Sequence, residues 1–375
     1  MTVLTWLRDT IVARRKKRIV SRVTPSDAAA LVDALAERQH LLVTGATGFI
    51  GMRLVEALTS AGHDVTVLAR DPAKATALRA QRVVTDLAQI PDDARIDAVI
   101  NFAGEPTGNA LWTRRKRRKI LSSRLRVTRA VNRLIARLAL RPAVVISGSA
   151  IGWYGLWQDE TLTEFDGGKR CFSHRVCDTW EREARKAQRL GVRVVRLRIG
   201  LVLGLEGGPL SQYLVPFELG LGGPVGSGRQ WMSWIERDDL VRLIAHIIAT
   251  PSLTGAVNAT APAPVRNEEF AHALAGALRR PALLRMPAAI LHYVAGAFAD
   301  ELMLGGQRVI PDKALLSGFV FRYENLRGAL DAMLGNASAR PMPAVKARSV
   351  PVAEQPVDQP AVEAPARLLR SLRAR

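Results

Sequence analysis

The chain has 375 residues, of which 48% are hydrophobic, and a formal net charge of +20 at pH 7. This length suits one large α/β domain with a smaller lobe, or two domains, and the hydrophobic content is enough for a substantial core. No run of 18 apolar residues occurs and the N-terminus lacks a signal-peptide pattern, which excludes a membrane-spanning helix and predicts a cytoplasmic protein. The two cysteines, Cys171 and Cys177, are too close together to staple a fold and have no metal-ligand spacing around them, which predicts a reduced protein without a metal site.

The positive charge is concentrated in two blocks of the sequence. Residues 14–18 and 114–119 consist only of Arg and Lys, and no acidic residue follows the second block before Arg141. A balance this basic favours anionic partners: a phosphorylated small molecule, an anionic membrane or a nucleic acid. The alternative is a solvated helix face. No helix-turn-helix, zinc-finger or RNP signature accompanies the charge, so nucleic-acid binding is supported by charge alone.

Residues 1–38 are predicted to form a basic helical leader. Its apolar stripe would consist of Trp6, Leu7, Ile11 and Val12. Ser26 or Asp27 can cap a second helix that runs to Glu37. The leader is predicted either to lie on an anionic membrane, peripheral to its inner face, or to pack on the main domain.

Residues 39–250 have the rhythm of a Rossmann-type α/β domain. Apolar runs at residues 40–44, 65–69, 98–102, 143–146 and 192–197 alternate with helical patterns. This alternation predicts a doubly wound parallel sheet covered by helices on both faces.

The rest of the chain predicts a smaller lobe and a tail. Residues 251–335 are expected to form a mostly helical C-terminal substrate lobe, to which residues 200–235 contribute. Asn267 caps one predicted helix, over residues 268–278, and a second runs from 288 to 304. Residues 336–375 combine repeated prolines with Ala and basic residues, which predicts a disordered tail.

A glycine-rich turn follows the first predicted strand and opens a helix. Gly45 allows a tight turn, Gly48 lets the backbone approach a pyrophosphate, and Gly51 lets helix and strand pack closely. A pyrophosphate bound here meets the helix N-terminus, where free N–H groups and the helix dipole favour negative charge. We therefore assign to nucleotide binding Gly45, Thr47, Gly48, Phe49, Ile50 and Gly51.

The end of the second predicted strand indicates which dinucleotide binds. NAD-dependent enzymes usually place an acidic residue there for the ribose hydroxyls, whereas this strand ends at Arg70. A guanidinium pairs with a 2′-phosphate, so the predicted cofactor is NADP(H). Asp86, after the third apolar run, stands where related folds hold the adenine amino group.

With these residues in view, the chain resembles the extended and atypical short-chain dehydrogenase/reductase superfamily. It resembles more closely the YfcH-like group of epimerase family proteins (39U family), which ends in a domain of unknown function. The resemblance covers about residues 40–335. It is carried by the glycine turn and by Asn101–Pro106, Ser147–Gly155, Val176–Glu181, Gly226–Ile235, Pro264–Phe270 and Glu301–Arg308.

The resemblance implies a nucleotide-binding half with a smaller lobe that closes over the nicotinamide. The cleft would be lined by Asn101, Ala103, Gly104 and Ser147. Ser149 would take the place of the superfamily's catalytic Ser, which hydrogen-bonds a substrate oxygen.

The sequence departs from the superfamily at the usual Tyr-x-x-x-Lys pair. Cys177 stands in place of Tyr and Glu181 in place of Lys, and a carboxylate raises a neighbour's pKa where Lys lowers it. Tyr154 is an alternative proton donor, or only shapes its loop. Cys177 is either a nucleophile or a small buried residue. Glu236 replaces a His frequent in relatives, and Asp238 and Asp239 are predicted to cap the next helix.

The loop from Gly222 to Trp231 suits a wall of the substrate pocket because it joins backbone freedom with a cation, an amide and an aromatic ring. The predicted substrate-binding residues are Glu105, Trp112, Arg229, Gln230 and Trp231. Trp112 and Trp153 fit equally well in the core.

Two functions fit these patterns. One is an NADP(H)-dependent reductase or epimerase that acts on a small polar substrate. The other is a nucleotide-binding regulator or scaffold that has lost turnover, as the missing Tyr and Lys would allow. Docking on an anionic membrane or nucleic acid through the basic surfaces is compatible with either.

Overall fold

The computed structural model describes residue 10 and residues 28–335, so the predicted stripe and basic block of the leader and the predicted tail lie outside the described residues. Its centre is a parallel sheet of seven strands in the order β11-β7-β5-β4-β1-β2-β3. The strands are β1 His40–Thr44, β2 Asp64–Leu68, β3 Arg82–Val84, β4 Ala98–Asn101, β5 Val144–Ala150, β7 Arg193–Ile199 and β11 Gly255–Ala259. The strand order reverses between β1 and β4, which is where doubly wound sheets open a cleft at the carboxyl ends of their strands.

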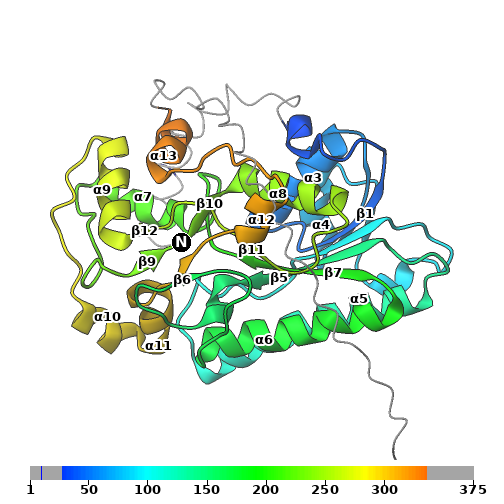
Figure 1. Ribbon diagram of the computed structural model, residues 1–375, viewed down its shortest axis with the longest axis horizontal. Helices are drawn as coiled ribbons and strands as arrows, with labels where there is room; N and C mark the ends of the chain where they lie inside the picture. The colour runs from blue at the N-terminus through cyan, green and yellow to red at the C-terminus, as the bar shows by residue number, and fades with distance from the viewer. Residues whose placement is uncertain (1–9, 11–27, 336–375) are drawn as a thin grey trace, which may run out of the picture. The chain divides into compact units, whose positions relative to one another are not determined.

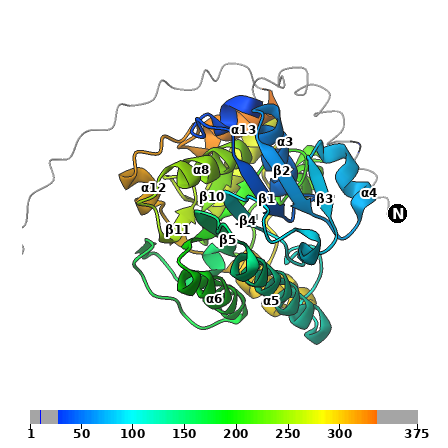
Figure 2. The ribbon, with the colours of Figure 1, turned by 90° about the vertical axis from the view of Figure 1, so that its right-hand side faces the viewer.

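Helices cover both faces of this sheet, as Figures 1 and 2 show. Helices α3 (Phe49–Ser60) and α8 (Arg237–Ala249) lie on one face, and α5 (Arg114–Arg137) and α6 (Phe172–Ala184) lie on the other. Leu41 and Val43 of β1 belong to the first core, whereas the intervening Leu42 packs with residues of α5. This alternation follows from the two-residue period of a strand. The fold is the predicted Rossmann arrangement, and no helix within residues 28–335 is long and apolar enough to cross a bilayer.

The remaining segments form the smaller lobe and short connections. Trp234 and Phe270 lie in a separate core shared by α7, α9 and α13. The helices are α7 Leu210–Glu218, α9 Asn267–Leu278, α10 Ala288–Ala295, α11 Ala297–Ala299, α12 Asp312–Leu316 and α13 Leu326–Leu334. The short strands are β6 Thr161–Leu162, β8 Leu201–Leu203, β9 Trp231–Met232, β10 Trp234–Glu236, β12 Val265–Arg266 and β13 Arg308–Val309. The short helical segments are α4 Pro72–Ala75, η1 Ala30–Val32, η2 Thr76–Leu78, η3 Leu87–Gln89, η4 Ile151–Tyr154, η5 Arg185–Leu190 and η6 Asp300–Leu304.

Three boundaries differ from the prediction. The predicted end of the Rossmann domain at residue 250 is too early, because β11 (255–259) pairs with β7 and completes the sheet. The polar Asn258 interrupts the apolar pattern of this strand. The helix predicted over 288–304 breaks at Gly296, which has a φ of 50°. The second leader helix stops after Val32, where the chain turns, and does not reach Glu37.

Helix α8 is capped by Glu236 and not by the two aspartates that follow it. The Oε2 atom of Glu236 accepts hydrogen bonds from the backbone N–H groups of Asp238 and Asp239, at 2.8 and 2.9 Å. The aspartates are occupied elsewhere: Asp238 pairs with Arg53, and Asp239 accepts bonds from the backbone after α12. Burial, together with the charges of Asp238 and Asp239, raises the pKa of Glu236 from 4.5 to about 8.

The variant Glu236→Gln is expected to flatten the pH dependence of stability between the two pKa values of 4.5 and about 8. Because the folded-state pKa is raised, the folded protein binds more protons than the unfolded chain in this window. The contribution of Glu236 to the free energy of unfolding is therefore greatest below the window and is lost as the pH rises through it. Urea denaturation across the window measures the slope, with Glu37→Gln on the exposed surface as the control. An unchanged slope in Glu236→Gln would contradict the assignment.

Candidate functional site

The glycine turn between β1 and α3 has the geometry that a dinucleotide requires. Gly45 has a φ of 76°, and a Cβ built on it would lie 2.8 Å from the carbonyl carbon of Phe102. A Cβ on Gly51 would lie 2.2 Å from the oxygen of Gly45. Helix α3 has no side-chain cap at Gly48, so its first-turn N–H groups remain available to an anion. Thr47 and Gly48 are exposed at this rim, next to Phe49 and Ile50.

Replacing Gly51 by Ala is expected to lower the free energy of unfolding by roughly 2 kcal/mol, because the added methyl group must push the turn away from the helix. The same shift would deform the anion site, so NADPH binding should be lost as well. Gly276→Ala is the matched control, since no atom lies within 4 Å of a Cβ built there. Thermal unfolding and NADPH titration of both variants check the prediction. Equal behaviour of the two would show that the turn tolerates a side chain.

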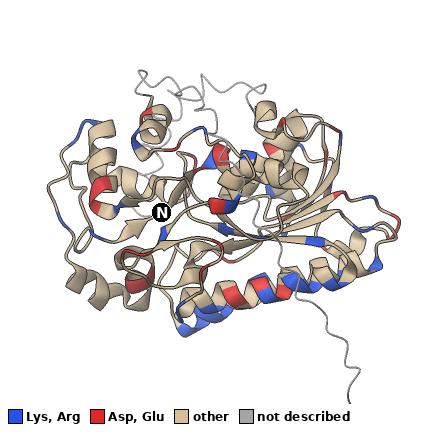
Figure 3. Cartoon of the chain, viewed as in Figure 1, with Lys and Arg blue, Asp and Glu red and all other residues tan. Residues whose placement is uncertain are grey.

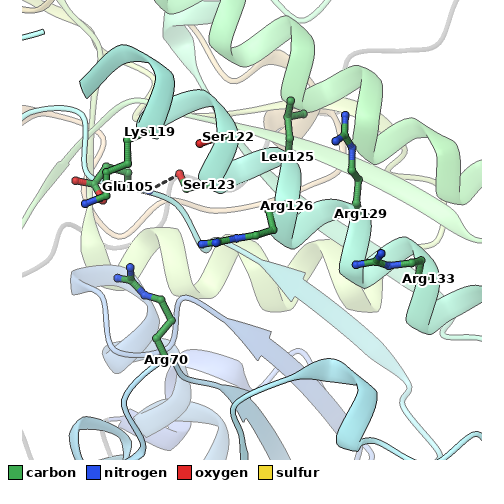
Figure 4. A pocket seen from close by; sticks show the side chains of 9 residues that line it. All are labelled: Arg70, Glu105, Lys119, Ser122, Ser123, Leu125, Arg126, Arg129 and Arg133. Atoms are coloured by element: carbon green, nitrogen blue, oxygen red, sulfur yellow. Dashed lines mark hydrogen bonds and ion pairs between the residues drawn. The ribbon is translucent and has the colours of Figure 1, made fainter. Parts of the chain in front are cut away.

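A cavity of about 580 Å³ with a cationic lining opens between the residue after β2 and helix α5 (Figure 4). Arg70 reaches it from the end of β2, and the other cations come from α5. The lining residues are Arg70, Glu105, Lys119, Ser122, Ser123, Leu125, Arg126, Arg129 and Arg133. Lys119 pairs with Glu105 at 3.1 Å and Arg129 with Glu183 at 3.4 Å. Within residues 28–335, Arg70, Arg126 and Arg133 have no ion pair, so their charges are available to an anionic ligand.

A buried chain of hydrogen bonds holds the strands that border the cleft. Thr44 donates to Asn101 Oδ1 at 2.8 Å, and Asn101 Nδ2 donates to Thr128 Oγ1 at 2.9 Å. Thr128 also accepts from Trp180 Nε1 at 3.0 Å, and the N–H of Ala103 donates to Thr44 at 3.2 Å. The side chain of Asn101 thus links β1 and β4 to helices α5 and α6 beneath the cleft.

The neighbouring predicted residues divide between the cleft wall and the interior. Gly104 lies against the side chain of Arg124, which is 3.1 Å from a Cβ built there. Ser147 is buried in β5 opposite Asn101 and donates a 3.4 Å hydrogen bond to the oxygen of Gly148. Asp86 caps the turn η3 by accepting from the N–H of Ala88, so this carboxylate is already engaged locally.

The predicted catalytic positions Ser149 and Cys177 are brought together at the end of β5. Cys177 and Glu181, one helical turn apart on α6, face this strand. The hydroxyl of Ser149 donates to Glu181 Oε1 at 2.8 Å, and all three residues are buried. Burial, followed by the charge of Glu181, raises the pKa of Cys177 to about 11, which keeps it a thiol and disfavours a nucleophilic role.

Two arginines of β7 compensate the buried carboxylate of Glu181. Arg198 Nε donates to Oε1 at 2.9 Å, and Oε2 accepts from Arg198 at 3.2 Å and from Arg196 at 3.0 Å. Arg196 and Arg198 reach the same side of the sheet because they are two residues apart in a strand. Where the superfamily has a lysine on the helix, this chain has an acid on the helix and cations on the adjacent strand.

Tyr154 lies in the same network but is fully buried. Its hydroxyl is 2.8 Å from both Thr163 O and Asn258 Oδ1 and accepts from Arg198 at 3.1 Å. Burial raises the pKa of Tyr154 to about 12. Its hydroxyl is thus a weak acid whose bonds are already made within the protein. The guanidinium of Arg198 stacks on the ring of Trp153 at 3.4 Å, which places Trp153 in this network.

The predicted substrate-binding residues do not form one surface. Glu105 lies in the cationic cavity, where Lys116 and Lys119 lower its pKa. Trp112 is buried with two phenylalanines of other elements. Trp231 lies in the smaller lobe between Arg266 and Arg308, at 4.0 and 4.7 Å.

The two polar residues before Trp231 also have different positions. Gln230 donates to Val225 O and Met303 O, at 2.9 and 2.8 Å, and so anchors the loop. Arg229 is exposed. The loop is therefore held by its amide, and the cation of Arg229 is the group that it presents to solvent.

Three arginines of the site, Arg124, Arg196 and Arg198, were not among the residues predicted from the sequence. Arg196 and Arg198 alternate in β7 with Val195 and Leu197, which are buried. Charged residues seldom occur at such positions without a partner, so the pattern itself predicts a buried acid nearby. Arg124 was hidden in the basic block of α5, although its guanidinium packs over Trp180 at 5.1 Å and donates to Glu105 O at 3.0 Å.

The parallel sheet, the glycine turn and the cluster at the end of β5 define a Rossmann-fold protein of the short-chain dehydrogenase/reductase class. The chain belongs to the NAD dependent epimerase/dehydratase family, whose model matches residues 41–259. Residues 286–333 match a domain of unknown function, DUF1731. The predicted resemblance is thereby confirmed.

Similar proteins come from plants, bacteria and animals. The chain is 38% identical over 300 residues to "Epimerase family protein SDR39U1 homolog, chloroplastic" of Arabidopsis thaliana, covering 78% of this chain and 86% of that protein. It is 35% identical to epimerase family protein YfhF of Bacillus subtilis, covering 79% and 98%. It is 33% identical to epimerase family protein SDR39U1 of Homo sapiens, covering 78% and 98%.

Solved structures agree with this assignment. The crystal structure of human epimerase family protein SDR39U1 (isoform 2) with NADPH has a TM-score of 0.72 and 31% identity, and covers 79% of this chain and 99% of that chain. A nucleoside-diphosphate sugar epimerase from Corynebacterium glutamicum has a TM-score of 0.64 and 28% identity, covering 83% and 61%. A UDP-galactose 4-epimerase, at 18% identity and a TM-score of 0.60, shares the fold.

Proposed function

We propose that the protein binds NADP(H) and uses it as an oxidoreductase or epimerase on a small polar substrate. The observation that carries the proposal is the cationic cavity at the end of β2, where Arg70 and residues of α5 offer unpaired positive charge. The structure of a 31% identical relative with NADPH supports the same cofactor. An acidic residue beside Arg70 would favour NAD(H). The acid in the cavity lining is Glu105, whose charge is neutralised by two lysines.

The residues present fit the cofactor. The close approach of Gly45 and Gly51 leaves no room for side chains, and the uncapped start of α3 supplies N–H donors for a pyrophosphate. Arg70, helped by Arg126, would hold the 2′-phosphate through charge-assisted hydrogen bonds. Asp86 keeps its capping role, so its carboxylate is engaged at η3.

The buried cluster would move the proton of the reaction. When bound, the nicotinamide accepts or supplies a hydride. Ser149 Oγ would take the proton from a substrate hydroxyl as its own proton passes to Glu181 Oε1, 2.8 Å away. In the reverse direction Glu181 returns the proton through Ser149. Arg196 and Arg198 hold Glu181 in position through their hydrogen bonds.

The second candidate is an NADP(H)-binding regulator or scaffold without turnover. It is favoured by the state of the two alternative catalytic groups, because Tyr154 is buried with its hydroxyl occupied and Cys177 is held as a thiol. Both candidates bind the same cofactor. They differ in whether a hydride is transferred between the cofactor and a substrate.

Stereospecific exchange of deuterium from position 4 of NADPH into a metabolite extract separates the two. The enzyme proposal predicts exchange that Ser149→Ala reduces about a hundredfold, since positioned acid–base groups contribute at least this much. NADPH affinity should stay within about twofold, because Ser149 lies outside the cationic cavity. Ser60→Ala, on the exposed end of α3, is the control.

Each failure of this experiment has a distinct meaning. NADPH binding without any exchange across a broad extract would support the regulator. Exchange that survives Ser149→Ala would contradict the role of Ser149 and leave cofactor binding intact. Absence of NADPH binding would overturn both candidates.

A further inference from the structure

Helix α10 is a surface helix that has no buried residue. Tyr293 is 91% exposed, Val294 63% and Ile290 54%, and the segment before the helix exposes Leu283 at 82% and Leu284 at 53%. A surface helix normally buries an apolar stripe against its own protein. Since α10 does not, its apolar area is available to a partner.

This apolar segment is held in a fixed place by the loop around residue 224. The N–H of Met286 donates to Pro224 O at 2.9 Å, and the N–H of Gly226 donates to Met286 O at 2.8 Å. A Cβ built on Gly223 would lie 1.9 Å from the oxygen of Leu284, so the two backbone segments are in direct contact. Leu221, 58% exposed, continues the apolar surface across this contact. We call the surface the α10 patch: Leu221, Leu283, Leu284, Ile290, Tyr293 and Val294.

Basic residues outnumber acidic ones around the α10 patch, where Asp300 Oδ1 lies 2.8 Å from Nδ1 of His292 on α10. No Asp or Glu occurs between Glu269 and Asp300, a stretch that contains Arg279, Arg280 and Arg285. Arg285 pairs with Glu268 at 2.8 Å, whereas within residues 28–335 no ion pair is found for Arg279 or Arg280. Figure 3 shows α10 itself without a Lys, Arg, Asp or Glu. An apolar surface bordered by cations therefore exists on a protein with a net charge of +20.

We propose that the α10 patch docks on the surface of an anionic lipid bilayer. Leu, Ile and Tyr side chains enter the boundary between headgroups and acyl chains, while adjacent arginines meet lipid phosphates. A second copy of the chain fits less well, because an isologous interface would bring Arg279 and Arg280 of both copies toward one another. A nucleic acid fits less well too, because the exposed aliphatic side chains would remain uncovered on a phosphate backbone.

The proposal is tested by sedimentation of the full chain with phosphatidylcholine vesicles, with and without phosphatidylglycerol. The parent protein should bind the anionic vesicles in a salt-sensitive manner. The double variant Leu283→Glu/Tyr293→Glu should bind them at least about tenfold more weakly, because two apolar anchors are lost and two negative charges are added. Arg279→Gln/Arg280→Gln should reduce binding to the anionic vesicles only.

The matched control is Leu140→Glu/Leu316→Glu, which places the same charges on leucines 65% and 76% exposed outside the patch. This variant should bind as the parent does, apart from a small electrostatic loss. Thermal unfolding and NADPH titration confirm that each variant is folded. Because vesicle binding and NADPH binding are measured separately, a failure of this proposal can be distinguished from a failure of the proposed function.

Three outcomes would overturn the proposal. The first is equal vesicle binding by the patch variant and the parent, which would assign the binding to another basic surface such as α5. The second is equal loss in the patch and control variants, which would show a general charge effect. The third is unchanged vesicle binding together with conversion of a dimer to a monomer in sedimentation velocity, which would assign the patch to a second copy of the chain.

Discussion

Replacement of Arg70 by Glu is expected to weaken NADPH binding about a hundredfold or more. The side chain lies at the end of β2 in a cavity with Arg126, Arg129 and Arg133, and no carboxylate within residues 28–335 pairs with it. A charge-assisted hydrogen bond contributes about 1.5–3 kcal/mol, and the reversed charge adds repulsion of the 2′-phosphate. At 1.4 kcal/mol for each factor of ten, the loss amounts to roughly two orders of magnitude.

The effect should be selective for the phosphorylated cofactor. NADH has no 2′-phosphate, so its affinity should change far less, and the preference for NADPH should fall or reverse. Arg126→Glu should give a similar loss if both cations share the phosphate. Arg189→Glu, which makes the same charge change at an exposed residue outside the cavity, is the control. Fluorescence titration measures the affinity of the parent protein and of each variant for both nucleotides. Equal losses for NADPH and NADH would show that Arg70 acts on another part of the cofactor, or only on the turn.

The nucleotide half of the site follows from the sequence because its constraints are local. Gly45 is required by its φ of 76°, Gly51 by its contact with the oxygen of Gly45, and Arg70 by its place at the end of a strand. Such features are set within a few residues of chain, so spacing alone predicts them. The apolar runs predict the other strands of the sheet for the same reason. Strand β11 was not predicted, because it contains the polar Asn258, whose side chain bonds to the distant Ile310.

The chemical half of the site depends on contacts between distant segments. The carboxylate of Glu181 is paired with Arg196 and Arg198, which lie on another element. The hydroxyl of Tyr154 is hydrogen-bonded to Asn258, 104 residues away. Ser149 and Cys177 were proposed from superfamily spacing, and spacing alone does not fix the burial that both have in the fold. Burial and ion pairing are properties of the assembled fold, and they decide here which of the candidate groups can handle a proton.

Replacement of Arg198 by Met is expected to lower the free energy of unfolding by about 3–5 kcal/mol, because it leaves a buried carboxylate without its main cation. Glu181 is 1% exposed and Arg198 2% exposed, so water cannot replace the lost partner. Arg196, 17% exposed, reaches Oε2 only and compensates in part. The stacking of Arg198 on Trp153 is lost as well. A fall in Tm of roughly 10 °C should accompany the change.

The double variant Glu181→Met/Arg198→Met should recover most of this stability, because well-packed apolar residues of similar volume often replace a buried ion pair without loss. Urea denaturation of the two single variants and the double variant gives the coupling free energy between the residues. A double variant as unstable as Arg198→Met would show that Arg198 acts through packing alone. If Glu181 also accepts the proton of Ser149, the stable double variant should bind NADPH and fail to exchange its hydride. Recovery of both stability and exchange would instead make the pair purely structural and move the proton to another group.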